Sequence, residues 1–257
     1  MDIRPPYGYQ EVVPLTKQHR VALPEAGKVP PAFRGITALP LSFTEFAVAC
    51  RDYPIAFIGG EGGTYLAMAV LGLENQQNLF VTADGGWDPA VYLPAYVRRY
   101  PFCMTRVTVD GREQPERVAC VEKRALSDKG EALYDAKGES LPAWDERRKL
   151  LFEYESDLVR SEEMCRELAQ LQLLETFTMQ AVPNQGEPLA MTGMYRVAEE
   201  KLAALPAEKL KELAQKGSLA RVYAHLISLA NFGRLLDRRA TQPKPADAPG
   251  RNRRKPN

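Results

Sequence analysis

Histidine and cysteine, the side chains most often used for metal binding and covalent catalysis, are scarce in this sequence. His19 and His225 are the two histidines, and neither lies in a Glu-x-x-His or His-Glu-x-x-His pattern. The four cysteines lie far apart without a C-x-x-C pair, at Cys50, Cys103, Cys120 and Cys165. We therefore expect no metal site and no cofactor, and we expect buried free thiols, as is typical of a reducing cytoplasm.

The most suggestive pair of nucleophile and base is a serine and a histidine near the C-terminus. His225 lies three residues before Ser228 within one predicted helix. Such a pair lacks the strained turn and the oriented acid that activate a catalytic serine, and no serine lies in a Gly-x-Ser-x-Gly motif. The pattern favours a partly buried histidine with satisfied hydrogen bonds over a general base, so we predict no catalytic residue.

The glycine-rich segment at residues 59–63, Gly-Gly-Glu-Gly-Gly, invites comparison with a phosphate-binding loop. It lacks the Lys-Ser/Thr pair of a P-loop, and a strand-like apolar run follows it where a P-loop has a helix. The segment is typical of a hairpin turn between two buried strands.

Aromatic and basic side chains cluster in two stretches of the sequence. Flat rings and guanidinium groups bind sugars, peptides and carboxylates by stacking and by paired hydrogen bonds. The candidate residues for binding a ligand or partner are Arg51, Tyr53, Trp87, Tyr92, Tyr96, Arg98, Arg99, Tyr100, Tyr195 and His225. The more common outcome for such residues is that the tyrosine rings pack in the core and the arginines are solvated at helix ends.

Most of these candidates belong to a pattern that occurs twice, in which a helix ends at a Tyr-Pro pair and a strand hairpin follows. In the first unit, Ser42 and Glu45 have capping-box spacing. The helix that they begin is expected to end near Arg51, because a residue before proline is disfavoured in a helix. Strands are predicted at 55–58 and 65–71.

The second unit repeats this order. A helix is predicted to begin at Asp88 and to end at Tyr100, and strands are predicted at 102–109 and 117–121, with a further strand candidate at 78–82. The two Tyr-Pro pairs are 47 residues apart. This spacing indicates either a duplicated unit or the coincidence of two common helix stops.

The C-terminal half is dominated by amphipathic helices. A long helix is predicted from Pro142, a hairpin at 177–182 and 188–197, and a final helix at 218–236. The expected buried stripe of the final helix consists of Leu219, Val222, Tyr223, Leu226, Ala230 and Gly233.

These elements predict an α+β fold, in which an antiparallel sheet built from the two helix-hairpin units packs with a helical C-terminal half. One domain is expected over residues 39–237, mainly sheet in 39–124 and mainly helical in 142–237. Residues 1–38 predict an extended N-terminal arm. Residues 238–257 predict a disordered basic tail, because they hold no apolar side chain larger than alanine.

Charge is unevenly distributed along the chain of 257 residues. The last twenty residues hold seven basic and one acidic side chain, whereas residues 1–237 hold 27 basic and 32 acidic ones. A mildly acidic body argues against a nucleic-acid partner. The tail is expected either to aid solubility or to attract nucleic acid, anionic lipid or an acidic protein partner.

The hydropathy pattern argues against a membrane protein. No run of about 18 apolar residues occurs, so no membrane span is expected. The first fifteen residues contain acids and prolines and do not match a signal peptide. A cytoplasmic location is therefore expected, with surface association through an unusual export route as the alternative.

Six stretches of the sequence resemble the bacterial SapC family. They are Leu39-Pro-Leu-Ser-Phe-Thr-Glu-Phe, Arg51-Asp-Tyr-Pro-Ile-Ala-Phe, Asn78-Leu-Phe-Val-Thr-Ala-Asp-Gly-Gly-Trp-Asp, Tyr92-Leu-Pro-Ala-Tyr-Val-Arg-Arg-Tyr-Pro-Phe, Gly193-Met-Tyr-Arg-Val-Ala-Glu-Glu-Lys-Leu and Tyr223-Ala-His-Leu-Ile-Ser-Leu. The resemblance extends from about residue 10 to residue 238. It implies a link to bacterial surface layers, from which the family takes its name, or to TonB-dependent receptors, near which members are often encoded. It carries over no catalytic residue.

We therefore expect a non-enzymatic cytoplasmic accessory protein that binds a protein or peptide partner in a surface-layer, cell-envelope or TonB-linked uptake pathway. The alternative is an enzyme or a sensor of a small sugar or peptide ligand. Its pocket would be formed by Tyr53, Trp87, Tyr96, Arg99 and His225. One closed cavity in which His225 reaches an acid would favour the alternative, whereas an exposed apolar face would favour partner binding. The oligomeric state does not follow from the sequence.

Overall fold

The computed structural model describes residues 2–59, 63–109, 112–181 and 188–241. Several predicted features lie wholly or partly outside the described residues. They are the turns at 59–63, 110–111 and 184–186, and the basic tail from residue 242 onward.

The larger of two main sheets has five antiparallel strands in the order β10-β11-β5-β6-β4. Its strands are β4 (Ala38–Pro40), β5 (Ile55–Gly59), β6 (Tyr65–Val70), β10 (Leu174–Ala181) and β11 (Leu189–Val197). It combines the first predicted hairpin with the C-terminal hairpin. Both hairpins were therefore predicted correctly in kind, although β10 begins at Leu174, three residues before the predicted start.

The second sheet has four strands in the order β1-β7-β8-β2. Its strands are β1 (Asp2–Ile3), β2 (Val12–Pro14), β7 (Phe102–Val109) and β8 (Arg112–Glu122). A separate pair joins β3 (Arg20–Val21) to β9 (Glu131–Ala132). The N-terminal segment thus supplies β1 and β2 to the four-stranded sheet and β3 to the separate pair. Val21 and Phe33 within this segment are fully buried.

The α+β class is confirmed, but the two helix-hairpin units contribute to different sheets and not to a single one. The reason lies in the edges of each hairpin. The β5–β6 hairpin is flanked by β11 and β4, whereas the β7–β8 hairpin is flanked by β1 and β2. Because both edges of each hairpin are already paired, the two hairpins cannot pair with each other.

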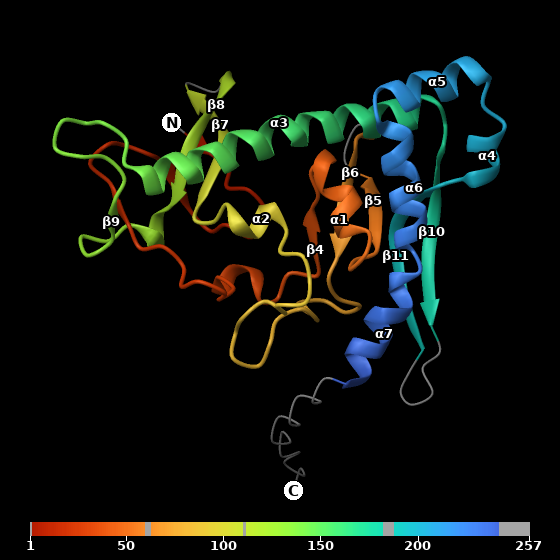
Figure 1. Cartoon of the computed structure of the whole chain (residues 1–257), viewed down its shortest axis with the longest axis horizontal. Helices are drawn as coiled ribbons and strands as arrows, with labels where there is room; N and C mark the ends of the chain where they lie inside the picture. Colours follow the sequence, from red (N-terminus) through yellow and green to blue (C-terminus); the bar gives the residue numbers. More distant parts are fainter. Residues whose placement is uncertain (1, 60–62, 110–111, 182–187, 242–257) are drawn as a thin grey trace, which may run out of the picture.

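Helix α3 (Pro142–Gln170) connects the two halves of the molecule. It runs along both sheets, as Figure 1 shows, with its start near β9 and its end near α5. Trp144 and Leu151 pack in the smaller core cluster, whereas Met164, Cys165 and Leu168 pack in the larger one. The buried face of this helix therefore spans two cores.

The first predicted helix is present as a short 3-10 turn (Phe43–Glu45) that continues into α1 (Phe46–Ala49). The capping-box prediction is confirmed, because the Ser42 amide and hydroxyl donate to Glu45 Oε2 at 3.0 and 2.7 Å. Asn231 Nδ2 donates to the Cys50 carbonyl oxygen at 2.8 Å, just beyond the end of α1.

The second predicted helix is much shorter than the pattern indicates. Only Ala95–Arg98 are helical, as α2, and the segment from Asp88 to Pro94 is irregular. Pro94 explains the difference, because proline lacks an amide proton and disfavours helical geometry at Leu93. The strand candidate at 78–82 is also absent as a strand, and Val81 forms only an isolated bridge to Trp87.

Four helices complete the described chain: α4 (Glu199–Ala203), α5 (Ala207–Gln215), α6 (Ser218–Ser228) and α7 (Asn231–Thr241). The predicted final helix is divided into α6 and α7, and α7 continues past residue 238, where the tail was predicted to begin. Figure 1 shows α6 packed across the larger sheet. No helix in the described part of the chain is long and apolar enough to cross a membrane.

Candidate functional site

Tyr53 and Trp87, two of the predicted binding residues, lie together in the interior. Trp87 Nε1 donates to the Tyr53 hydroxyl at 3.1 Å, and that hydroxyl donates to the carbonyl oxygen of Tyr92. Burial raises the pKa of Tyr53. Arg51, in contrast, is exposed, and its Nε contacts the Val48 carbonyl oxygen at 3.4 Å. The pair of rings thus forms part of the core.

Tyr92 bonds to the buried carboxylate of Glu45, a residue that was not among the predicted candidates, and Arg98 bonds to Tyr92. Glu45 Oε1 accepts the Tyr92 hydroxyl at 3.0 Å and the Ala95 amide at 2.7 Å. Arg98 Nη2 donates to the Tyr92 hydroxyl at 3.0 Å. Burial and the Glu45 charge raise the pKa of Tyr92 to about 12. Glu45 therefore fixes the loop that precedes α2 against the start of α1.

Tyr96 and Arg99 belong to a third cluster, in which a buried guanidinium is surrounded by rings. Arg99 Cζ lies 4.1 Å from the Tyr96 ring centroid and 4.7 Å from that of Tyr154. Its Nη1 pairs with Glu155 Oε1 at 2.9 Å, and Glu155 also pairs with Arg117. Arg99 Nε and the Tyr154 hydroxyl are buried without a hydrogen-bond partner among the described residues. The space between these tyrosine rings is therefore occupied by the guanidinium group of Arg99.

Tyr100 and Tyr195 lie in separate places. Tyr100 packs against Tyr9 and Phe33, with ring centroids 5.4 and 5.5 Å away. Tyr195, on β11, makes an edge contact with Tyr65 at 5.0 Å. Tyr100 is linked to the cluster around Arg99 through the rings of Tyr9 and Phe33.

His225 is fully buried between α6 and the larger sheet. Its Nε2 accepts the Val197 amide at 3.1 Å, so its Nδ1 carries the proton and donates to the Ile55 carbonyl oxygen at 2.7 Å. Burial lowers the pKa of His225 to about 4. The ring bonds to two backbone groups and to no acid, so its geometry is that of a structural histidine.

The ten predicted residues are thus divided among several clusters and do not form one cavity. The alternative pocket was expected to join five of them: Tyr53, Trp87, Tyr96, Arg99 and His225. These residues are buried in the core and do not line the pocket described below. The sequence did not reveal that the protein's own side chains fill the space between these rings.

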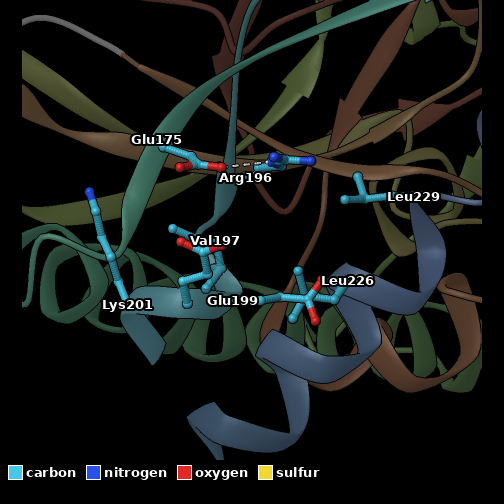
Figure 2. A pocket seen from close by; sticks show the side chains of 9 residues that line it. Glu175, Arg196, Val197, Glu199, Lys201, Leu226 and Leu229 are labelled. Atoms are coloured by element: carbon cyan, nitrogen blue, oxygen red, sulfur yellow. Dashed lines mark hydrogen bonds and ion pairs between the residues drawn. The ribbon is translucent and has the colours of Figure 1, made fainter. Parts of the chain in front are cut away.

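A pocket of about 420 Å³ opens where β10 begins, β11 ends and α4 begins. Figure 2 shows its side chains, with the Glu175–Arg196 ion pair from the two strands, Leu226 from α6 and Leu229 just after the end of that helix. Arg196 Nε lies 2.9 Å from Glu175 Oε1. Glu199 and Glu200 also line this pocket, and neither makes an ion pair within the described ranges.

Next to this pocket, α6 presents apolar side chains to solvent. Tyr223 is 51% exposed and Ile227 is 69% exposed, and their spacing of four residues places them on one side of the helix. We call Tyr223, Leu226, Ile227, Leu229, Glu199 and Glu200 the α4–α6 surface. It combines exposed apolar groups with acidic groups at one edge.

The comparison with protein families shows to which family the chain belongs. A family model described as SapC matches residues 16–235, which is most of the chain. The chain belongs to the SapC family. No match to a curated protein or to a solved structure was found.

Three of the four thiols of this SapC-family chain are buried, which disfavours the reactive thiolate form. Burial raises the pKa of Cys120 to about 11 and that of Cys165 to about 12, and it raises the pKa of Cys103 further. All four cysteines are free. Within the described residues, no group of three or more His, Cys, Asp or Glu side chains is arranged to hold a metal ion.

Sequence reasoning misplaced the exposed face of α6 in this SapC-family chain. The predicted buried stripe included Tyr223, Ala230 and Gly233, and all three are exposed. The buried face of α6 differs from the predicted face because it contains His225 and Ser228. These are polar residues that a hydropathy pattern assigns to solvent. Their hydrogen bonds to the sheet were the missing signal.

Proposed function

We propose that this SapC-family protein is a non-enzymatic accessory protein that binds a protein or peptide partner, and that its pathway is a bacterial surface-layer, cell-envelope or TonB-linked uptake pathway. The observation that carries the proposal is the exposure of Tyr223 and Ile227 beside the pocket. Tyrosine is enriched among the few residues that provide most of the binding energy in protein interfaces, and contiguous exposed apolar side chains mark interaction sites. The pathway rests on the family resemblance alone.

The acidic edge of the α4–α6 surface specifies the chemistry of the partner. Glu199 and Glu200 are exposed and make no ion pair within the described ranges, whereas Arg196 is already paired with Glu175. A complementary segment presents apolar side chains to Ile227 and a basic side chain to Glu199 or Glu200. We therefore propose a peptide or helix with apolar and basic residues as the occupant.

Site-specific photo-crosslinking in the native host tests where the partner binds. A photoreactive amino acid replaces Tyr223 in one variant and Phe152, an exposed residue of α3, in a matched control. We expect one protein to be crosslinked from position 223 and not from position 152. Mass spectrometry then identifies that protein, and the interaction is reconstituted with purified components.

Two results would contradict the proposal. The first is that the purified partner binds equally well after Ile227→Ser, because the α4–α6 surface is then not the interface. The second is turnover of a sugar or peptide by the purified protein that is lost with His225→Gln, because the protein is then an enzyme.

A further inference from the structure

Strand β10 forms a free edge of the larger sheet. It pairs with β11 alone, and its other side bonds to no backbone group within the described part of the chain. Figure 1 shows β10 on the outer side of this sheet, with β11 between it and β5. The neighbouring α4 segment bonds to residues that precede the strand, because Lys201 Nζ donates to the Gln172 carbonyl oxygen at 3.2 Å. The edge along β10 is therefore open to another strand.

The other edges of the two main sheets are short. Strands β4 and β2 have three residues each and end in Pro40 and Pro14, and β1 has two residues. Free strand edges pair readily with other chains, and proteins usually keep them short or interrupt them with proline, lysine or a bulge. Strand β10 has eight residues and contains neither proline nor lysine. It is thus the one long edge of these two sheets without such a device.

The irregularity in the β10–β11 pair lies in the inner strand. The register changes from Phe177 opposite Met194 to Met179 opposite Met191, which is two residues along β10 but three along β11. The extra residue is therefore in β11, where Gly193 has a φ of +78°. A bulge leaves the alternation of the opposite strand intact. The outer strand β10 is consequently regular.

This alternation determines which backbone groups of β10 face outward. The Ala198 amide donates to the Leu173 carbonyl oxygen at 2.8 Å, which continues the register of the two strands by one residue. Successive residues of an antiparallel strand face its partner and the opposite side in turn. The amides and carbonyls of Thr176, Thr178 and Gln180 therefore face away from β11. The side chains of these three residues are exposed.

We propose that β10 pairs with β10 of a second copy of this chain, antiparallel and centred on Thr178. A two-fold axis at this position places Thr178 opposite Thr178 of the second copy, and Thr176 opposite Gln180 of the second copy. These are the residues whose backbone groups face outward, so each pair exchanges two hydrogen bonds. The larger sheets of the two copies then form one continuous sheet.

The side chains of β10 also complement themselves in this register. Phe177, which packs on Phe232 at 5.8 Å between ring centroids, lies opposite Met179 of the second copy. The threonines and the glutamine meet on the opposite side of the sheet. Glu175 is the one charged residue of β10, and it faces Ala181 of the second copy. No like charges are brought together, and this self-complementarity favours a second copy over a charged peptide as the occupant.

Sedimentation velocity of the full chain over a range of concentrations tests this dimer. We expect a dimer that dissociates on dilution. Thr178→Pro removes the central outward amide and should weaken the dimer about tenfold or more. It leaves the β10–β11 pair intact, because that amide does not face β11. Thr178→Ser keeps the amide and is the matched control, with an expected change of less than about twofold.

Two lysine variants test the register and replace the proline variant if its melting curve shows that it is unfolded. Thr178→Lys places two like charges opposite each other at the two-fold axis. It should weaken the dimer about fivefold or more at low ionic strength and less in high salt. Thr176→Lys is its control, because this residue faces Gln180 of the second copy, and it should change the dimer affinity less than about twofold.

The dimer is refuted if the chain sediments as a monomer at every concentration, or if Thr178→Pro and Thr178→Ser dissociate equally while both are folded. Equal weakening by Thr178→Lys and Thr176→Lys would refute the register centred on Thr178. Ile227→Ser should dimerise as the unaltered chain does, because Ile227 lies on the α4–α6 surface and outside β10. Loss of the dimer in Ile227→Ser with retention in Thr178→Pro would place the interface on α6.

Discussion

His225 links α6 to two strands through its neutral ring. The ring needs one protonated nitrogen for the Ile55 carbonyl and one free nitrogen for the Val197 amide. Adding a second proton breaks the bond with the amide and leaves a charge in the core. The histidine therefore contributes to stability only while it is uncharged.

This requirement predicts how stability depends on pH. The pKa of His225 is about 4 in the folded protein and close to 6.5 when the chain is unfolded, so the unfolded chain binds the extra proton between these values. The free energy of unfolding should decrease as the pH falls from about 6.5 toward 4. The stabilisation that the neutral His225 ring provides should be fully present above pH 6.5. Denaturant melts across this range measure the slope. His225→Gln should be less stable near neutral pH, by about 1–3 kcal/mol, but should show a smaller slope.

Glu155 has a comparable role for the buried guanidinium groups. It is the shared partner of Arg99 and Arg117. Glu155→Gln leaves the buried Arg99 without its counter-charge and should destabilise the protein by about 3–5 kcal/mol in chemical denaturation. Glu153→Gln, at an exposed position that pairs with Lys149, is the matched control and should cost less than about 1 kcal/mol. Equal effects of the two substitutions would show that Glu155 is not needed to neutralise Arg99.

At the scale of elements, the junction between α6 and α7 is anchored to the end of α1. Asn231 Nδ2 donates to the carbonyl oxygens of Cys50 and Tyr53, at 2.8 and 3.1 Å. Asn231→Ala removes both bonds and should lower the free energy of unfolding by about 1–3 kcal/mol. Hydrogen exchange should then increase first in α7. Unchanged exchange there would mean that apolar packing of Phe232 and Leu235 holds the helix without Asn231.

The element scale also shows what the sequence could reveal. Hairpins and the long helix follow from hydrophobic periodicity, and the capping box at Ser42 was found from spacing alone. The length of α2 was overestimated because apolar spacing outweighed Pro94 in the prediction. The exposed face of α6 was missed because His225 and Ser228 are buried through bonds to distant strands, and no local pattern encodes such bonds.

At the scale of the whole molecule, α3 joins two hydrophobic cores. Trp87 lies in the larger core cluster and Trp144 in the smaller one, and the chain contains no other tryptophan. Because one continuous helix packs on both cores, we predict that they unfold together. Trp87→Phe and Trp144→Phe each leave one tryptophan as a fluorescent reporter. In each variant, the urea midpoint measured by fluorescence should coincide with the midpoint measured by circular dichroism. A core that melts separately from the helical signal would show that α3 does not couple the two.

At this scale the prediction of a single sheet built from two repeated units was wrong. The N-terminal strands β1 and β2 pair with the edges of the second hairpin and thereby keep it apart from the first.

The affinity of the crosslinked partner for Ile227→Ser, measured beside Val159→Ser, tests the central claim most directly. Both residues are exposed and aliphatic, but Val159 lies on α3 and outside the α4–α6 surface. We predict that Ile227→Ser weakens binding about tenfold or more, while Val159→Ser changes it less than about twofold. Equal affinities for the two variants would contradict the assignment of α6 as the partner-binding helix.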